Sequence, residues 1–138
     1  NVEADIWSCP SFTLLARDGA AAARWNLLHP TAPPRKPYVQ QCLENTEGPV
    51  IASTDYVRGY AEQIRPYLPG RFKVLGTDGF GRSDTREKLR HFFEVDRYWV
   101  TTASLAALAE EEKLDPAKVA EAVRKYGIDP EKPNPLTV

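Results

Sequence analysis

The feature that most constrains this chain is a strand, helix, strand pattern between residues 49 and 75. Residues 49–52 form a short apolar run typical of a buried strand, and Phe72 to Leu75 form a second one. Between them, apolar residues share one helical face: Val57, Tyr60, Ala61, Ile64 and Leu68. We expect Asp55 to cap this helix and Pro69-Gly70 to end it. Such a βαβ unit pairs two parallel strands through a right-handed crossover, and parallel strands need cover on both faces.

The rest of the chain supplies helices for that cover. We predict a short strand over Val2 to Ile6, then a helix that Ser11 caps and Gly19 interrupts. Residues 29–37 contain four prolines and should be irregular, and a short helix follows over 38–43.

Three further helices are expected in the second half of the chain. The first has an Asp84/Glu87 capping box, and the second spans residues 98–112. The last begins at Asp115-Pro116 and closes at Gly127, after which a proline-rich tail follows the surface.

A glycine-rich loop over residues 76–86 follows the second predicted strand. Its three glycines, Gly76, Gly79 and Gly81, allow positive φ angles or close contact with another surface. Because parallel strands run the same way, this loop and residues 53–55 should emerge together at the carboxyl edge of the sheet, where α/β domains bind ligands and partners. The candidate interface or docking residues at this edge are Asp55, Asp78, Phe80, Arg82, Ser83, Asp84 and Arg86.

The same loop suggests a phosphate site, since a helix N-terminus after a strand attracts anions. However, its G-x-x-G-x-G spacing matches neither the dinucleotide fingerprint nor the nucleotide P-loop. No lysine follows the last glycine, and Asp78 and Asp84 would repel an anion. A structural or docking turn is therefore favoured, and an anion or nucleotide regulatory site stays open as an alternative.

Other chemistry finds little support in the residues. His29 and His91 have no partners at metal-ligand spacing, so we predict no metal site. Ser83, His91 and Asp96 could form a triad on paper, but no nucleophile elbow surrounds the serine. Residue types alone thus indicate no catalytic residue and no cofactor-binding residue.

Composition excludes several classes of partner. The chain has 18 basic and 19 acidic residues, so no charge excess points to nucleic acid or a membrane surface. Cys9 and Cys42 are interpreted as buried free thiols. We predict a soluble cytoplasmic protein. Because methionine is absent even at position 1, we also predict that the chain is a fragment.

Several blocks spread over the whole chain carry a family resemblance. They include residues 15–19 (LARDG), 24–26 (RWN), 28–30 (LHP), 52–56 (ASTDY), 75–83 (LGTDGFGRS), 89–91 (LRH), 93–96 (FEVD) and 134–135 (NP). These blocks resemble the C-terminal domain of bacterial homodimeric pyruvate dehydrogenase. This is the thiamine-diphosphate-dependent decarboxylating component of the pyruvate dehydrogenase complex.

The resemblance implies one transketolase C-terminal-like domain over residues 1–138, with an α/β/α sandwich and a mostly parallel sheet. In the family this domain begins with a further strand and helix, which we expect to lie upstream of Asn1 and to be missing here. Thiamine diphosphate and magnesium are held by two preceding domains, so no catalytic, cofactor or metal residue carries over, and the fragment alone should be inactive.

The resemblance also implies partners. These are the remainder of the same polypeptide, the second subunit of a homodimer and the dihydrolipoyl acetyltransferase core. The competing hypothesis is a pure protein-interaction module that uses the same loop residues.

Overall fold

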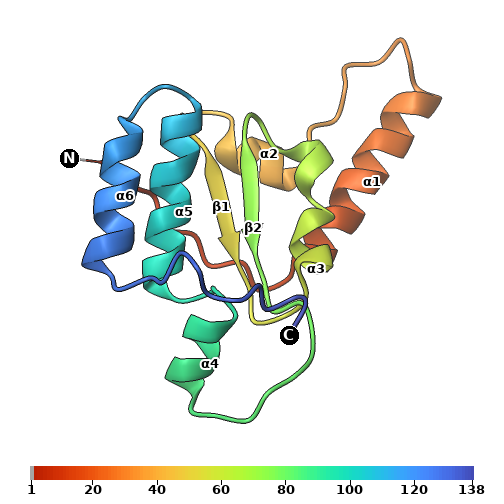
Figure 1. Ribbon diagram of the computed structural model, residues 1–138. Helices are drawn as coiled ribbons and strands as arrows, with labels where there is room; N and C mark the ends of the chain where they lie inside the picture. The colour runs from red at the N-terminus through yellow and green to blue at the C-terminus, as the bar shows by residue number, and fades with distance from the viewer. Residues whose placement is uncertain (1) are drawn as a thin grey trace.

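The computed structural model describes residues 2–138 and centres on a parallel pair of strands (Figure 1). β1 (Val50–Ser53) and β2 (Phe72–Leu75) pair so that Val50 lies opposite Phe72 and Ser53 opposite Leu75. α3 (Arg58–Glu62) and a 3-10 turn, η1 (Arg65–Tyr67), connect the two strands. The predicted α/β class and βαβ unit are therefore confirmed.

Helices cover both faces of this two-stranded sheet (Figure 1). On one side lie α1 (Phe12–Leu28), α2 (Tyr38–Leu43) and α3, and on the other lie α5 (Arg97–Glu110) and α6 (Pro116–Lys125). α4 (Arg86–Phe92) lies beyond the carboxyl ends of the strands. The arrangement is three-layered, with the cover on both faces that parallel strands require.

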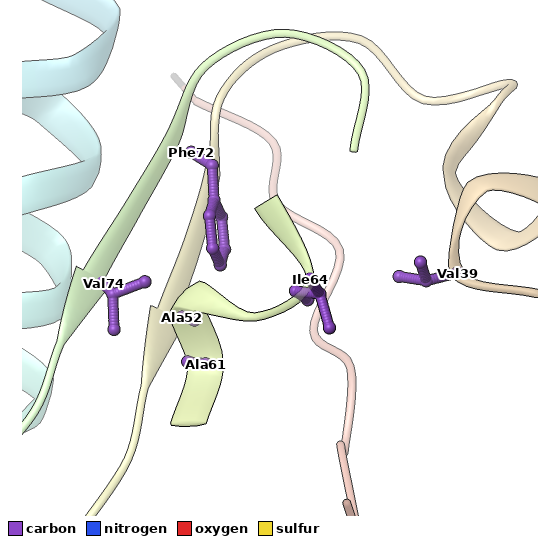
Figure 2. Close-up of a cluster of buried hydrophobic side chains, with 6 residues drawn as sticks. All are labelled: Val39, Ala52, Ala61, Ile64, Phe72 and Val74. Carbon is purple, nitrogen blue, oxygen red and sulfur yellow. The ribbon is translucent and has the colours of Figure 1, made fainter. Parts of the chain in front are cut away.

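The hydrophobic core lies between the sheet and the α1–α3 side. Six buried side chains form it: Val39, Ala52, Ala61, Ile64, Phe72 and Val74 (Figure 2). Side chains alternate across a strand. Lys73 accordingly leaves the opposite face and pairs with Glu110 of α5 at 2.5 Å.

Gly19 does not interrupt α1, which corrects the prediction. Ser11 Oγ accepts a hydrogen bond from the Leu14 N–H at 3.2 Å, as expected of a cap, and the helix then runs unbroken to Leu28. A Cβ on Gly19 would lie 2.3 Å from Cε2 of Tyr67. The glycine therefore provides room for an aromatic ring rather than a break.

The helix predicted over residues 57–68 is shorter than expected. It ends after Glu62, and the chain tightens into η1. Pro66 has no N–H to donate to the Glu62 carbonyl four residues earlier, so the α-helical ladder cannot continue. The face assignment also fails for Val57 and Tyr60, because both side chains are exposed. Tyr60 forms an edge-on aromatic pair with Tyr56 at 5.5 Å.

Two predicted caps are also corrected. Val57, not Asp55, occupies the cap position of α3, and its side chain makes no capping bond. At α4, Thr85 takes the cap position that Asp84 was expected to hold, and its hydroxyl accepts from the Lys88 N–H at 3.4 Å. Both predictions failed because an aspartate near a helix start can form hydrogen bonds or ion pairs with groups other than the first N–H groups of the helix.

The predicted strand over Val2 to Ile6 is wrong. In the described part of the chain only β1 and β2 form a sheet, and Ile6 is 96% exposed. A strand requires a neighbour to complete its hydrogen bonds, and alternation of apolar residues does not supply one. Two other predictions hold: residues 29–37 are irregular, and Asp115 caps α6, which Gly127 follows with φ 64°.

Candidate functional site

The two loops at the carboxyl edge are joined by hydrogen bonds. The Thr54 N–H donates to the Leu75 carbonyl at 3.0 Å, and the Thr77 N–H donates to the Tyr56 carbonyl at 2.9 Å. The Thr77 hydroxyl donates to the Asp55 carbonyl at 2.6 Å. The loops therefore continue the strand pairing past the end of the sheet, and they emerge together as predicted.

Gly76 makes this pairing possible. A Cβ at this position would lie 2.9 Å from both the backbone nitrogen of Arg58 and the carbonyl oxygen of Tyr56. Real Cβ atoms do not approach backbone so closely, so glycine is required where the two loops cross. The first glycine of the loop thus serves backbone contact within the protein.

Asp78 fixes the start of α3 from the neighbouring loop. Its Oδ1 accepts a hydrogen bond from the Arg58 N–H at 3.0 Å, and its Oδ2 lies 3.4 Å from Arg58 Nε. A carboxylate at a helix N-terminus satisfies an unpaired N–H and complements the helix dipole. Asp78 thus occupies the position that a bound anion would take at α3.

Phe80 and two arginines are exposed beyond this joint. The Phe80 side chain is 80% exposed, and the guanidinium of Arg82 lies 4.5 Å from the ring centroid of Phe92. Arg86, the first residue of α4, is exposed and forms no ion pair within residues 2–138. An exposed aromatic flanked by arginines has the composition of a protein contact surface.

Ser83 and Asp84 lie at an open hollow of about 340 Å³. Its lining residues are Arg82, Ser83, Asp84, Lys88, Leu89 and Phe92. Asp84 Oδ1 accepts from the Thr85 N–H at 2.7 Å and lies 3.8 Å from Lys88 Nζ. The carboxylate offsets the nearby basic charge, which disfavours an anion here.

Asp55 is exposed on the first loop, where its carboxylate faces α4. Its Oδ1 lies 3.7 Å from Arg90 Nε, and Arg90 Nη2 also donates to the Val95 carbonyl at 3.4 Å. The Ser53 hydroxyl donates to the same carbonyl at 3.1 Å. All seven candidate residues therefore come from the two loops and the start of α4, and Asp55 connects the first loop to α4.

His91 and Asp96 come together, but in a structural role. His91 Nδ1 lies 2.8 Å from Asp96 Oδ2, while Asp96 Oδ1 accepts from the N–H groups of Tyr98 and Trp99. Asp96 is the N-cap of α5. Within residues 2–138, Ser83 makes no hydrogen bond to His91, so the geometry assembles a cap and its neighbour and no triad.

Sequence reasoning missed a second set of residues next to this edge. Lys132 Nζ lies 2.9 Å from Glu94 Oε1. It also lies over the rings of Phe92 and Trp99, at 5.0 and 5.5 Å from their centroids. Glu94 adopts φ 64°, which is unusual for a residue other than glycine. No local pattern indicates this group, because the ion pair joins residues 38 positions apart.

Metal and membrane chemistry find no further support in the described residues. Among residues 2–138, no three His, Cys, Asp or Glu side chains gather closely enough to hold a metal ion. No helix formed by these residues is both long and apolar enough to cross a bilayer.

Comparison with known proteins gives concordant matches. The model of the transketolase-like TK C-terminal domain family matches residues 1–96. The pyruvate dehydrogenase E1 component of Cupriavidus necator is 66% identical over 137 residues, which cover 99% of this chain and 15% of that protein. The E1 component of Pseudomonas aeruginosa is 62% identical over 136 residues, 98% of this chain and 15% of that protein. That of Escherichia coli K12 is 51% identical over 135 residues, 97% of this chain and 15% of that protein.

The chain therefore spans about 15% of the length of the curated relatives it matches. The family model covers well over half of the 138 residues, and the parallel βαβ unit with helices on both faces agrees with it. On this basis, the chain belongs to the transketolase-like C-terminal domain family.

Proposed function

We propose that this chain is the C-terminal domain of a pyruvate dehydrogenase E1 component. The parent enzyme decarboxylates pyruvate on thiamine diphosphate and reductively acetylates lipoyl groups. The observation that carries the proposal is the 66% identity over 99% of the chain with a protein of that name. Identity at this level along the whole length indicates a shared role, which a shared fold alone would not.

This domain supports the chemistry of other domains rather than performing it. The described residues do not fit the cofactor: they contain no cluster of three metal-ligating side chains. At the carboxyl edge, Asp78 occupies the start of α3 and would repel a diphosphate. In the proposed enzyme, the upstream domains hold thiamine diphosphate and magnesium.

Activity measurements test this assignment. The full polypeptide that carries this chain should reduce an artificial electron acceptor in the presence of pyruvate, thiamine diphosphate and Mg²⁺. The 138-residue chain alone should not. A full polypeptide that is inactive on pyruvate but active on another 2-oxo acid would contradict the substrate, and decarboxylation by the isolated chain would contradict the supporting role.

The role of the carboxyl edge is protein contact, either with the second subunit of the homodimer or with the dihydrolipoyl acetyltransferase core. The exposed Phe80 between Asp78 and Arg82 favours a contact role. An interface anchor of this type contributes about 2 kcal/mol or more to binding, so Phe80→Ala should weaken the contact roughly 30-fold. Leu27→Ala, which removes an equally exposed apolar side chain from α1, is the matched control.

Charge reversal separates the two contacts. The double variant Arg82→Glu, Arg86→Glu in the full polypeptide is assayed for dimer mass by light scattering and for acetyltransferase binding by co-sedimentation. Loss of binding with an intact dimer supports docking, and loss of the dimer supports packing between subunits. If both assays match the unsubstituted protein, the edge is not an interface.

A further inference from the structure

The C-terminal strap, residues 128–138, crosses the carboxyl edge of the sheet. From α6 it passes below α5 and ends beside the glycine loop (Figure 1). Ile128 anchors its start, being only 6% exposed, and its N–H donates to the Val123 carbonyl at 3.0 Å. The strap therefore does not merely follow the surface, as the sequence predicted, but is anchored by buried residues.

The first contact along the strap is the Lys132–Glu94 ion pair. The two side chains are only 16% and 23% exposed, and the ammonium also lies over Phe92 and Trp99. Partial burial reduces solvent screening, so such a pair is stronger than one at a fully exposed site. Phe92 also receives the guanidinium of Arg82 from the glycine loop. One aromatic ring therefore contacts both the strap and the loop.

The second contact is between backbones. Pro135 is buried, and its carbonyl oxygen lies 2.4 Å from the position that a Cβ on Gly79 would occupy. Gly79 has φ 100°, a conformation that side chains rarely adopt. The strap thus rests directly on the turn that presents Phe80.

Little else holds the middle of the glycine loop. Within residues 2–138, no backbone N–H of residues 78–85 donates to a backbone carbonyl. The loop is fixed at one end by Thr77 and Asp78 and at the other by α4, so the contacts at Gly79 and Phe92 lie where its own hydrogen bonding is weakest.

We propose that the C-terminal strap is a clamp that positions the glycine loop, holding Phe80 and Arg82 in the exposed arrangement seen here. The identity of the partner that the loop contacts rests on the proposed function, but the clamp itself is a property of this chain. Release of the strap would let residues 78–85 move, because local opening is easiest where few hydrogen bonds are lost.

Hydrogen exchange read by mass spectrometry tests the clamp in the full polypeptide. Lys132→Met keeps an apolar stem on the aromatic rings and removes the charge. We expect it to speed exchange about five- to tenfold at the hydrogen-bonded amides that flank the loop, those of Thr77 and Leu89, although the substituted residue lies outside the loop. Lys113→Met removes a lysine that pairs with Glu111 on another surface, and it should leave the loop unchanged.

Three glycines form a second, independent set of variants. Gly79→Ala introduces both a backbone clash and a strained φ, and it should speed exchange in the loop and in the strap together. Gly70→Ala introduces only the strained φ of 72°, and Gly81→Ala introduces neither. These two controls should leave the strap unchanged.

Limited trypsin cleavage after Arg82 and Arg86 provides an activity-independent check, and Lys132→Met and Gly79→Ala should both accelerate it. The clamp is overturned if exchange at these flanking amides in Lys132→Met equals that of the unsubstituted protein. It is also overturned if Gly79→Ala affects the loop and leaves the strap protected. Faster exchange spread equally over β1 and β2 would indicate general destabilisation and would likewise overturn it. None of these outcomes depends on pyruvate turnover, so the clamp and the proposed function can fail separately.

Discussion

Replacement of Gly19 by alanine should destabilise this protein, although the same change stabilises most helices. Gly19 lies in the middle of α1, where glycine costs about 0.8–1.0 kcal/mol relative to alanine. In open space the substitution would recover that amount. Here the new Cβ would lie 2.3, 2.4 and 2.6 Å from three atoms of the Tyr67 ring.

The contact with Tyr67 determines whether Gly19→Ala raises or lowers the free energy of unfolding. Ordinary contact between carbon atoms requires about 3.5–4.0 Å, so the ring must move by more than 1 Å. Tyr67 packs against the core cluster that contains Ile64 and Phe72. Overpacking of this kind costs about 1–3 kcal/mol, and after the helix gain is subtracted we expect Gly19→Ala to lower the free energy of unfolding by about 1 kcal/mol.

Gly59 provides a matched control within the same protein. It also lies in a helix, α3, but a Cβ there would meet nothing within 4 Å. Gly59→Ala should therefore raise the free energy of unfolding by about 0.5–1 kcal/mol. Urea unfolding followed by circular dichroism measures both values, provided that the slope of the transition stays unchanged.

A double variant tests the cause. Tyr67→Ala removes the ring, so adding Gly19→Ala to it should recover the helix gain and become stabilising. If Gly19→Ala stabilises the unsubstituted chain as Gly59→Ala does, the ring contact is not what requires glycine. If it destabilises equally with and without Tyr67, the cost comes from elsewhere and the reasoning fails.

Two further predictions concern charged groups. Hydrogen bonds from Arg65, at 2.6 and 2.8 Å, lower the pKa of Glu62 below its ordinary value of 4.5, so this pair adds stability above that pH and loses it as the pH falls through the lowered pKa. Glu62→Gln should therefore be less stable at pH 7 and show a flatter loss of stability below about pH 4.5 in acid titrations followed by circular dichroism, and an unchanged acid profile would contradict the role of the pair. Asp96→Ala removes the cap of α5 and should cost about 1–2 kcal/mol in urea unfolding, whereas Asp96→Asn should retain most of the stability. An equal loss in both variants would instead point to the carboxylate charge beside His91.

The sequence predicted the elements whose determinants are local. The strands at residues 50–53 and 72–75, and the caps at Ser11 and Asp115, depend on residues within a few positions of each other. The two strands also predicted the shared carboxyl edge, because the loops that follow parallel strands leave the sheet on the same side. The sequence therefore places all seven candidate residues at this one edge of the sheet.

What escaped prediction depends on distant partners. Asp78 caps a helix that begins 20 residues earlier, and the ring that Gly19 accommodates lies 48 positions later. The strap contacts at Lys132 and Pro135 likewise join residues far apart in the chain. The error at Val2 to Ile6 has the same origin, since alternation shows that a segment can form a strand but not that another strand is present to pair with it.

Asp78 also supports the proposal that the carboxyl edge contacts a protein rather than an anion. In nucleotide-binding α/β domains the helix N-terminus at this edge is left free, so that its N–H groups can bind phosphate. Here a carboxylate from the next loop already accepts the Arg58 N–H, and a second carboxylate accepts the Thr85 N–H just before α4. A phosphate approaching either helix start would meet a carboxylate that is already hydrogen-bonded there. The exposed Phe80, Arg82 and Arg86 could contact an apolar or acidic protein surface without displacing either carboxylate, which supports our proposal of protein contact at this edge.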